Sequence, residues 1–102
     1  MVVKRGDIWR ALGPAGKRSA PCVVVSPPEL HDFLRTVIVL PMATSGKPAP
    51  FRIAMRFDGK AGLILVDQVR ALEKSRLIAR LGAVSPATLR ASLAVLQQAF
   101  AL

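Results

Sequence analysis

The stretch FRIAMRFDGKAGLILV, residues 51–66, decides the fold class of this 102-residue chain. Apolar and polar side chains alternate over residues 51–57, which predicts a strand whose apolar face, Phe51 included, is turned to a core. Asp58-Gly59 follows and accepts the positive φ angles of a tight hairpin turn. The apolar run at residues 63–66 then supplies the partner strand. An antiparallel β-hairpin is therefore predicted in the middle of the chain.

Further strand signals lie on both sides of this hairpin. Residues 21–26 and 36–40 are rich in β-branched side chains and lack polar alternation, as is typical of strands buried on both faces. Residues 6–12 form a first strand, and residues 69–72 continue or follow the hairpin. Residues 73–81 are expected to form a short helix that ends at Gly82.

The last element is a helix with a clear start signal. Ser85 is a good N-cap, and Pro86 suits the first helical position. Apolar residues follow at helical spacing and form one stripe that docks on the sheet or on a partner. The chain as a whole is predicted to be a single domain, residues 1–102, of the α+β class but mostly β, with five or six strands in a small, curved barrel and a terminal helix. The stripe consists of Leu89, Leu93, Leu96 and Phe100.

The composition narrows the possible partners. Lys and Arg number 15 and Asp and Glu number 6, so the net charge of +9 favours a polyanion. One Cys and one His exclude an internal disulfide and a Cys-cluster zinc site, and the scattered acids predict neither a metal site nor a cofactor. No apolar run reaches the ~18 residues of a membrane span, and no signal peptide is visible. We therefore expect a cytoplasmic protein that does not bind membranes.

Polar side chains in unexpected places are the candidates for a site. Asp67 and Gln68 interrupt two apolar stretches, where they either hydrogen-bond neighbouring loops or mark the rim of a site. Two hydroxyl residues follow the buried strand at the mouth of a loop, and two cations lie in the loop before residues 21–26, where they could meet a phosphate. His31 is a further candidate, because its side chain titrates near neutral pH, although a lone histidine in a polar loop is usually just surface. The other candidates are Lys17, Arg18, Thr44, Ser45, Asp67 and Gln68.

The order of the motifs resembles the MazF/PemK/Kid family of toxin endoribonucleases. The motifs are RGDIW at residues 5–9, a proline-opened strand at 21–27, VIVLP at 37–41 with a Thr-Ser pair after it, and VDQVRAL at 66–72. The resemblance implies an SH3-like β-barrel with a C-terminal helix, assembled as a homodimer. It also implies metal-independent cleavage of single-stranded RNA by attack of the ribose 2′-OH, and a cognate antitoxin whose acidic tail lies across the RNA groove.

For an active nuclease of this kind, we assign roles to individual residues as a hypothesis. Arg18 would stabilise the charge of the phosphate, Thr44 and Ser45 would donate hydrogen bonds to it, and Asp67 would position the 2′-OH or accept its proton. The expected RNA-contacting residues are Lys17, His31, Arg52, Gln68 and Arg70.

Two positions depart from the family pattern. Ala20 stands where the family has an arginine before the proline of the second strand, and Ala43 stands on the family threonine. Either Arg18 and Thr44 take over these functions through shifts of their loops, or the nuclease is weakened or lost.

Two alternative functions therefore remain. The first is a catalytically impaired homologue that binds RNA or an antitoxin and cuts nothing. The second is a gyrase-poisoning toxin of the CcdB type, which acts through a Trp-containing C-terminus. The sequence here ends in QAFAL, residues 98–102, which argues against that second alternative.

Overall fold

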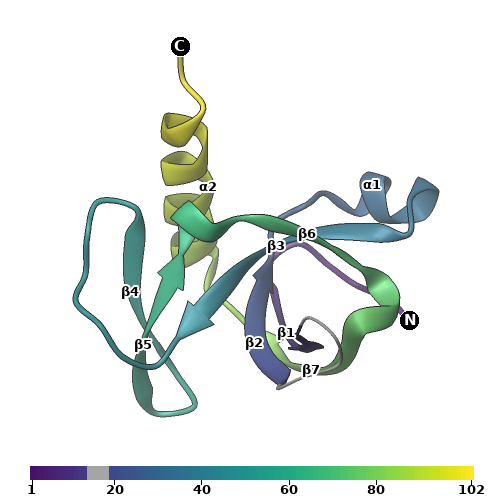
Figure 1. Ribbon diagram of the computed structural model, residues 1–102, viewed down its shortest axis with the longest axis horizontal. Helices are drawn as coiled ribbons and strands as arrows, with labels where there is room; N and C mark the ends of the chain where they lie inside the picture. The colour runs from purple at the N-terminus through teal and green to yellow at the C-terminus, as the bar shows by residue number, and fades with distance from the viewer. Residues whose placement is uncertain (14–18) are drawn as a thin grey trace.

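The computed structural model describes residues 1–13 and 19–102, and over these residues the chain is mostly β (Figure 1). Seven strands form one antiparallel sheet that curls into a half-barrel, with helix α2 at the C-terminal end. The α+β, mostly β class and the small curled barrel are confirmed. The elements are β1 (Asp7–Leu12), β2 (Ser19–Val24), α1 (Pro28–Phe33), β3 (Thr36–Ala43), β4 (Arg52–Phe57), β5 (Lys60–Leu65), the 3₁₀ turn η2 (Val66–Gln68), β6 (Arg70–Glu73), the 3₁₀ turn η3 (Lys74–Arg76), β7 (Leu77–Ala83) and α2 (Pro86–Ala99).

Strand β3 is the element around which the sheet curls. The strand order is β4-β5-β3-β2-β1-β7, and β6 also pairs with β3. The first half of β3 pairs with β6, from Thr36↔Glu73 to Val39↔Arg70, whereas its end pairs with β5 through Met42↔Ile64. Because one strand serves both neighbours, the β4–β5 hairpin leaves the plane of the β2–β1–β7 part of the sheet, and Figure 1 shows it to one side of those strands.

The two faces of the sheet carry separate apolar cores. Successive side chains of a strand point to opposite faces, so Ile8 and Val23 enter one core while Trp9 and Cys22 enter the other. Each large apolar side chain that is fully buried contributes about 1.5–3 kcal/mol relative to exposure. The buried character expected for residues 21–26 is confirmed at Val23, Val24 and Val25, which are all at most 3% exposed.

Asp7 connects the N-terminal motif to the edge of the sheet. Its carboxylate is 4% exposed and accepts hydrogen bonds from the backbone N–H of Lys4 at 2.9 Å and from Trp9 Nε1 at 3.4 Å. It also pairs with Arg80 Nε at 3.2 Å. A buried carboxylate needs such partners, and Arg80 lies on β7, so Asp7 joins β1 to the last strand of the sheet.

The predicted hairpin and its turn are confirmed, with strands Arg52–Phe57 and Lys60–Leu65. Asp58 and Gly59 have φ angles of 55° and 75°, the positive values of a type I′ turn, and Phe57 pairs with Lys60 across it. The ring of Phe57 lies over β7, because a Cβ built on Gly82 would lie 3.5 Å from Phe57 Cε1. The tip of the hairpin therefore rests on the β1–β7 part of the sheet.

Helix α2 begins as expected. The hydroxyl of Ser85 accepts a hydrogen bond from Thr88 N at 3.1 Å, and Pro86 occupies the first turn. Leu93 and Leu96 pack on the core, whereas Phe100 lies past the helix and is 71% exposed. No helix in the described residues is long and apolar enough to cross a membrane.

The prediction of a helix over residues 73–81 is wrong. These residues form the end of β6, the turn η3 and most of β7, which pairs with β1 from Asp7↔Ala83 to Ala11↔Leu77. Leu, Ile, Ala and Arg are compatible with a helix, but the ladder to β1 and the burial of Leu77 outweigh that weak preference.

Candidate functional site

An open cavity lies where β2 begins. Its volume is about 400 Å³, and its lining is mostly apolar, with Cys22 among its residues. Ala20 and Pro21 line it from β2, and Arg70 lines it from β6. A cavity with apolar walls and a few charged groups is the usual form of a binding site.

The two arginines that line this cavity differ in whether their side chains are hydrogen-bonded. Arg76 donates hydrogen bonds from Nε at 3.2 Å and from Nη2 at 2.9 Å to the carbonyl of Leu12, and Nη2 also donates to the carbonyl of Gly13. Arg76 thereby fixes the end of β1. Arg70 is exposed and makes no side-chain hydrogen bond to any residue that the structure describes, so its guanidinium is available to an anion.

Cys22 is not a nucleophile at this site. Burial raises the pKa of its thiol to about 11, although the positive charge of Arg70 opposes that rise. The thiolate is the reactive form of cysteine, and it is negligible at neutral pH with such a pKa. At 4% exposure, Cys22 is a small core residue.

Thr44 and Ser45 directly follow β3 and are both exposed. They line a small cavity of about 150 Å³ over the β4–β5 hairpin. Thr44 also lines a second cavity, of about 210 Å³, to which Pro21 and Ala43 contribute. Because Pro21 borders both this second cavity and the one near Arg70, Thr44 and Arg70 belong to adjoining parts of one surface.

The two departures from the family pattern lie at the same end of one strand pair. The ladder between β2 and β3 ends at Cys22↔Pro41. Ala20 and Ala43 each lie two residues beyond that pair. The side chains that the family would place here are therefore both absent from one end of the β2–β3 pair, where Ala20 lines the cavity near Arg70 and Ala43 lines the one beside Thr44.

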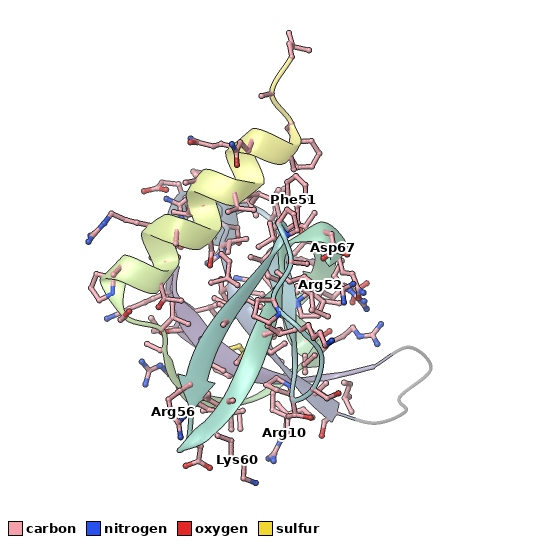
Figure 2. The ribbon with its side chains drawn as sticks, turned by 90° about the vertical axis from the view of Figure 1, so that its left-hand side faces the viewer. Arg10, Phe51, Arg52, Arg56, Lys60 and Asp67 are labelled. Carbon is pink, nitrogen blue, oxygen red and sulfur yellow. The ribbon has the colours of Figure 1, made fainter. Side chains whose placement is uncertain are left out.

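Arg52 and Asp67 bind each other at the turn η2. Arg52 Nε donates to Asp67 Oδ1 at 3.2 Å and Nη2 donates to Oδ2 at 3.1 Å, a two-pronged pair that Figure 2 shows on the outside of the hairpin. The hydrogen bonds from Arg52 hold the pKa of the Asp67 carboxyl below its ordinary value. Asp67 is exposed and lacks the burial that would raise its pKa toward that of a general base.

The pKa shift of Asp67 predicts a titration result. A lowered pKa means that the carboxylate stays ionised to a lower pH than an ordinary aspartate. In Arg52→Gln the charged donors are lost, so the pKa of Asp67 should rise toward its ordinary value of about 3.9. NMR titration of the Asp67 carboxyl carbon in both proteins measures this shift. Equal titration midpoints would show that the pair does not persist in solution.

The strand pattern assigned Phe51 to the core, and that assignment is wrong. The ring is 39% exposed and lies beside Arg52 and Asp67 (Figure 2). Strand β4 begins only at Arg52, so the alternation does not extend to Phe51, whose carbonyl instead accepts a hydrogen bond from Val66 N at 3.0 Å. Exposed aromatic rings are the usual stacking surfaces for unpaired bases. An aromatic residue next to a turn proline, Pro50, was the available signal.

His31 is not a surface residue, which corrects the expectation that it could contact RNA. It is 4% exposed, its Nε2 lies 2.5 Å from Ser26 Oγ and its Nδ1 lies 3.2 Å from the Val3 carbonyl. Since a carbonyl only accepts, Nδ1 carries the proton in this arrangement and the Ser26 hydroxyl donates to Nε2. The imidazole joins α1 to the N-terminal segment.

Three candidate site residues remain, of which the structure describes only Gln68. Gln68 is exposed at the end of η2, two residues before Arg70. Lys17 and Arg18 lie outside the described residues, immediately before Ser19 at the start of β2. The described residues contain no group of three His, Cys, Asp or Glu side chains that could hold a metal ion.

Comparisons with known proteins point to one family. Residues 4–100 match the family described as the PemK-like, MazF-like toxin of type II toxin–antitoxin systems. An endoribonuclease in complex with its cognate antitoxin, from a mycobacterial species, is 26% identical over 95% of this chain and 93% of its own, with a TM-score of 0.83. An endoribonuclease from a mycobacterial species is 25% identical over 97% and 91%, with a TM-score of 0.82. MazF from Deinococcus radiodurans shares the fold, at 23% identity, 100% and 99% coverage and a TM-score of 0.83.

Proposed function

This chain belongs to the PemK-like, MazF-like toxins of type II toxin–antitoxin systems, and on that premise we propose that it cuts single-stranded RNA at short sequences without a metal ion. The observation that best supports this proposal is the surface shared by Arg70 and Thr44. It combines an open cavity of about 400 Å³, an arginine available to an anion and exposed hydroxyl donors.

The proposed reaction is an internal transfer at phosphorus. The 2′-OH attacks the adjacent phosphorus, so the O2′–P bond forms and the P–O5′ bond breaks. The proton of the 2′-OH leaves to a base, and the 5′ oxygen takes up a proton, which yields a 2′,3′-cyclic phosphate and a 5′-OH end. The phosphorane between them gains negative charge, and fixed cations and donors stabilise that charge.

The chain's own side chains divide these tasks. Arg18 stabilises the phosphorane charge, while Thr44 and Ser45 donate hydrogen bonds to its oxygens. Asp67, kept ionised by Arg52, accepts a hydrogen bond from the 2′-OH and orients it. Arg52 thus acts through Asp67.

RNA binding in this proposal extends beyond the reacting atoms. Arg70, Lys17 and Gln68 hold the flanking backbone, and Phe51 stacks on an unpaired base. The net charge of +9 attracts RNA to this surface.

The protein partners follow from the same family. We infer a homodimer and a cognate antitoxin whose acidic segment competes with RNA for the positive surface. One mycobacterial relative was solved with its cognate antitoxin. Since RNA is the substrate, we place the protein in the cytoplasm.

A second function is favoured by the two alanines at the end of the β2–β3 pair. Ala20 and Ala43 offer no group to the phosphorane, so a toxin-like scaffold that binds RNA or an acidic antitoxin segment without cutting is the alternative.

One assay separates the two functions. Purified protein is incubated with long mixed-sequence RNA in EDTA, and the new ends are mapped and tested for 2′,3′-cyclic phosphate. Discrete cuts with cyclic ends are expected. Intact RNA that is nevertheless bound would show that the scaffold binds without cutting.

A further inference from the structure

The tip of the β4–β5 hairpin holds a lysine in a defined place. The Asp58-Gly59 turn sets the pairing Phe57↔Lys60, so these two side chains leave the hairpin on the same face. Phe57 packs toward Gly82 on β7, and Lys60 therefore points to the same side of the molecule, toward the β1–β7 part of the sheet. Lys60 itself is exposed.

A second cation reaches this place from β1. Arg10 pairs with Pro21 on one side and with Ala79 on the other, and it is exposed. It points to the same face as Ile8, which is the face over which the hairpin folds. Figure 2 shows Arg10 and Lys60 at one end of the molecule, although they belong to β1 and β5.

The cavity beside Lys60 also reaches Thr44. It measures about 210 Å³, and Lys60, Thr44 and Pro21 are among its lining residues. A water molecule occupies about 30 Å³ of liquid, so a phosphate group fits this volume. Pro21, the neighbour of Arg10 in the ladder, forms the wall on the β2 side.

The charges at this place are not balanced. Neither Arg10 nor Lys60 makes an ion pair with any residue of the described ranges, and Asp58 is the one acid among the residues that line the cavity. Arg56, also at the hairpin tip, is instead used by the turn, since its Nη2 donates to the Gly59 carbonyl at 2.9 Å. Lys60 thus shares with one carboxylate a cavity that carries a hydroxyl donor, and Arg10 lies behind its β2 wall as the ladder partner of Pro21.

From this juxtaposition we propose that Lys60 and Arg10 form a phosphate-binding subsite beside Thr44. The subsite holds the RNA backbone one or more phosphates away from the bond that is cut, and it depends on the proposed RNA-cleaving function. It adds binding energy and no chemistry. Because Lys and Arg bind phosphate by releasing counterions, the contribution depends on salt.

The salt dependence of RNA binding tests this subsite. Binding of a 2′-O-methyl RNA of mixed sequence, which lacks the attacking hydroxyl, is measured between about 50 and 200 mM salt for the wild type, K60M, R10Q and the double variant. Each lost phosphate contact should lower the slope of log K against log salt by about 0.7. Because the two cations hold the same phosphate, the double variant should lose about 0.7 in slope, and each single variant should lose less. K60R should keep the wild-type slope.

A matched control separates a local contact from the general charge. Arg90 is exposed on α2, so R90Q removes the same charge from another element and should leave the slope unchanged. In cleavage assays K60M should raise KM and leave kcat unchanged. Thermal unfolding shows whether each variant remains folded.

Three outcomes would overturn the subsite. A double variant with the wild-type slope, in a protein that still cuts RNA, would remove the subsite and leave the proposed function intact. An unchanged RNA slope with weakened binding of an acidic peptide would assign these cations to a protein partner instead. A wild-type protein that binds no RNA would overturn both the subsite and the proposed function.

Discussion

Arg18→Ala is expected to lower the rate of RNA cleavage by about two to three orders of magnitude, the usual cost of removing one donor that stabilises a developing oxyanion. The reason is that, apart from Arg70, which the proposal assigns to the flanking RNA backbone, no other arginine of the cavity near β2 is available to the phosphorane. Ala20 has no charge to offer, and Arg76 is occupied by the carbonyls of Leu12 and Gly13. Arg18 is the arginine that precedes β2 directly in the chain. Its planar fork of donors matches two phosphate oxygens.

Single-turnover cleavage at saturating protein, in EDTA, measures this effect without a contribution from binding. Lys17→Ala is the matched control, because it removes the adjacent positive charge. A residue that only holds the backbone should change the concentration needed for half-saturation and leave the saturated rate within a few-fold. If Arg18→Ala cuts RNA at the wild-type rate, the phosphorane charge is stabilised elsewhere, and Arg70 is the next cation to test.

The features predictable from sequence were those encoded by neighbouring residues. The hairpin followed from strict alternation and from a turn pair that tolerates positive φ, and both Asp58 and Gly59 adopt it. The start of α2 followed from Ser85, whose hydroxyl accepts a hydrogen bond from the backbone N–H of Thr88, three residues further along the chain. Such signals act over a few residues, so no tertiary contact is needed to recognise them.

The features that sequence reasoning missed depend on contacts between distant segments. Residues 73–81 became strand because β1, some 70 residues earlier in the chain, offers them a ladder. His31 is buried because the Val3 carbonyl and the Ser26 hydroxyl accept and donate at its two nitrogens. A lone histidine in a polar stretch carries no local sign of such partners.

The candidate site was predictable as a set of residues and not as an arrangement. Asp67 and Arg52 were both selected by type and position, but their pairing depends on the register Arg52↔Leu65, which brings the turn after β5 next to the start of β4. That pairing changes the expected chemistry, since an aspartate bound by arginine is a weak base. The adjoining cavities near Arg70 and Thr44 depend on the way β3 is shared between β2, β5 and β6.

Ala20→Arg in the Arg18→Ala background is expected to restore cleavage by at least about tenfold over Arg18→Ala alone. Ala20 lies on the same face of β2 as Cys22, two residues along the strand, and both line the large cavity. That cavity, of about 400 Å³, has room for a guanidinium group. Arg70 lines the same cavity, so repulsion between two arginines makes the restoration incomplete. A bound phosphate relieves that repulsion, because each guanidinium can bind its oxygens.

The decisive control is Ser19→Arg in the same background. Ser19 is the neighbour of Ala20 on β2, is exposed and pairs with Leu12, and its side chain points to the opposite face of the strand. Ser19→Arg therefore adds the same charge as Ala20→Arg, one residue away on β2, but directs it away from the cavity. Restoration by Ala20→Arg and not by Ser19→Arg would show that a cation directed into this cavity is what the reaction requires. Equal rates in the two double variants would mean that the reaction responds to the general positive charge near β2. If neither variant restores cleavage that the wild type performs, Arg18 acts from a position that the face of β2 does not reach.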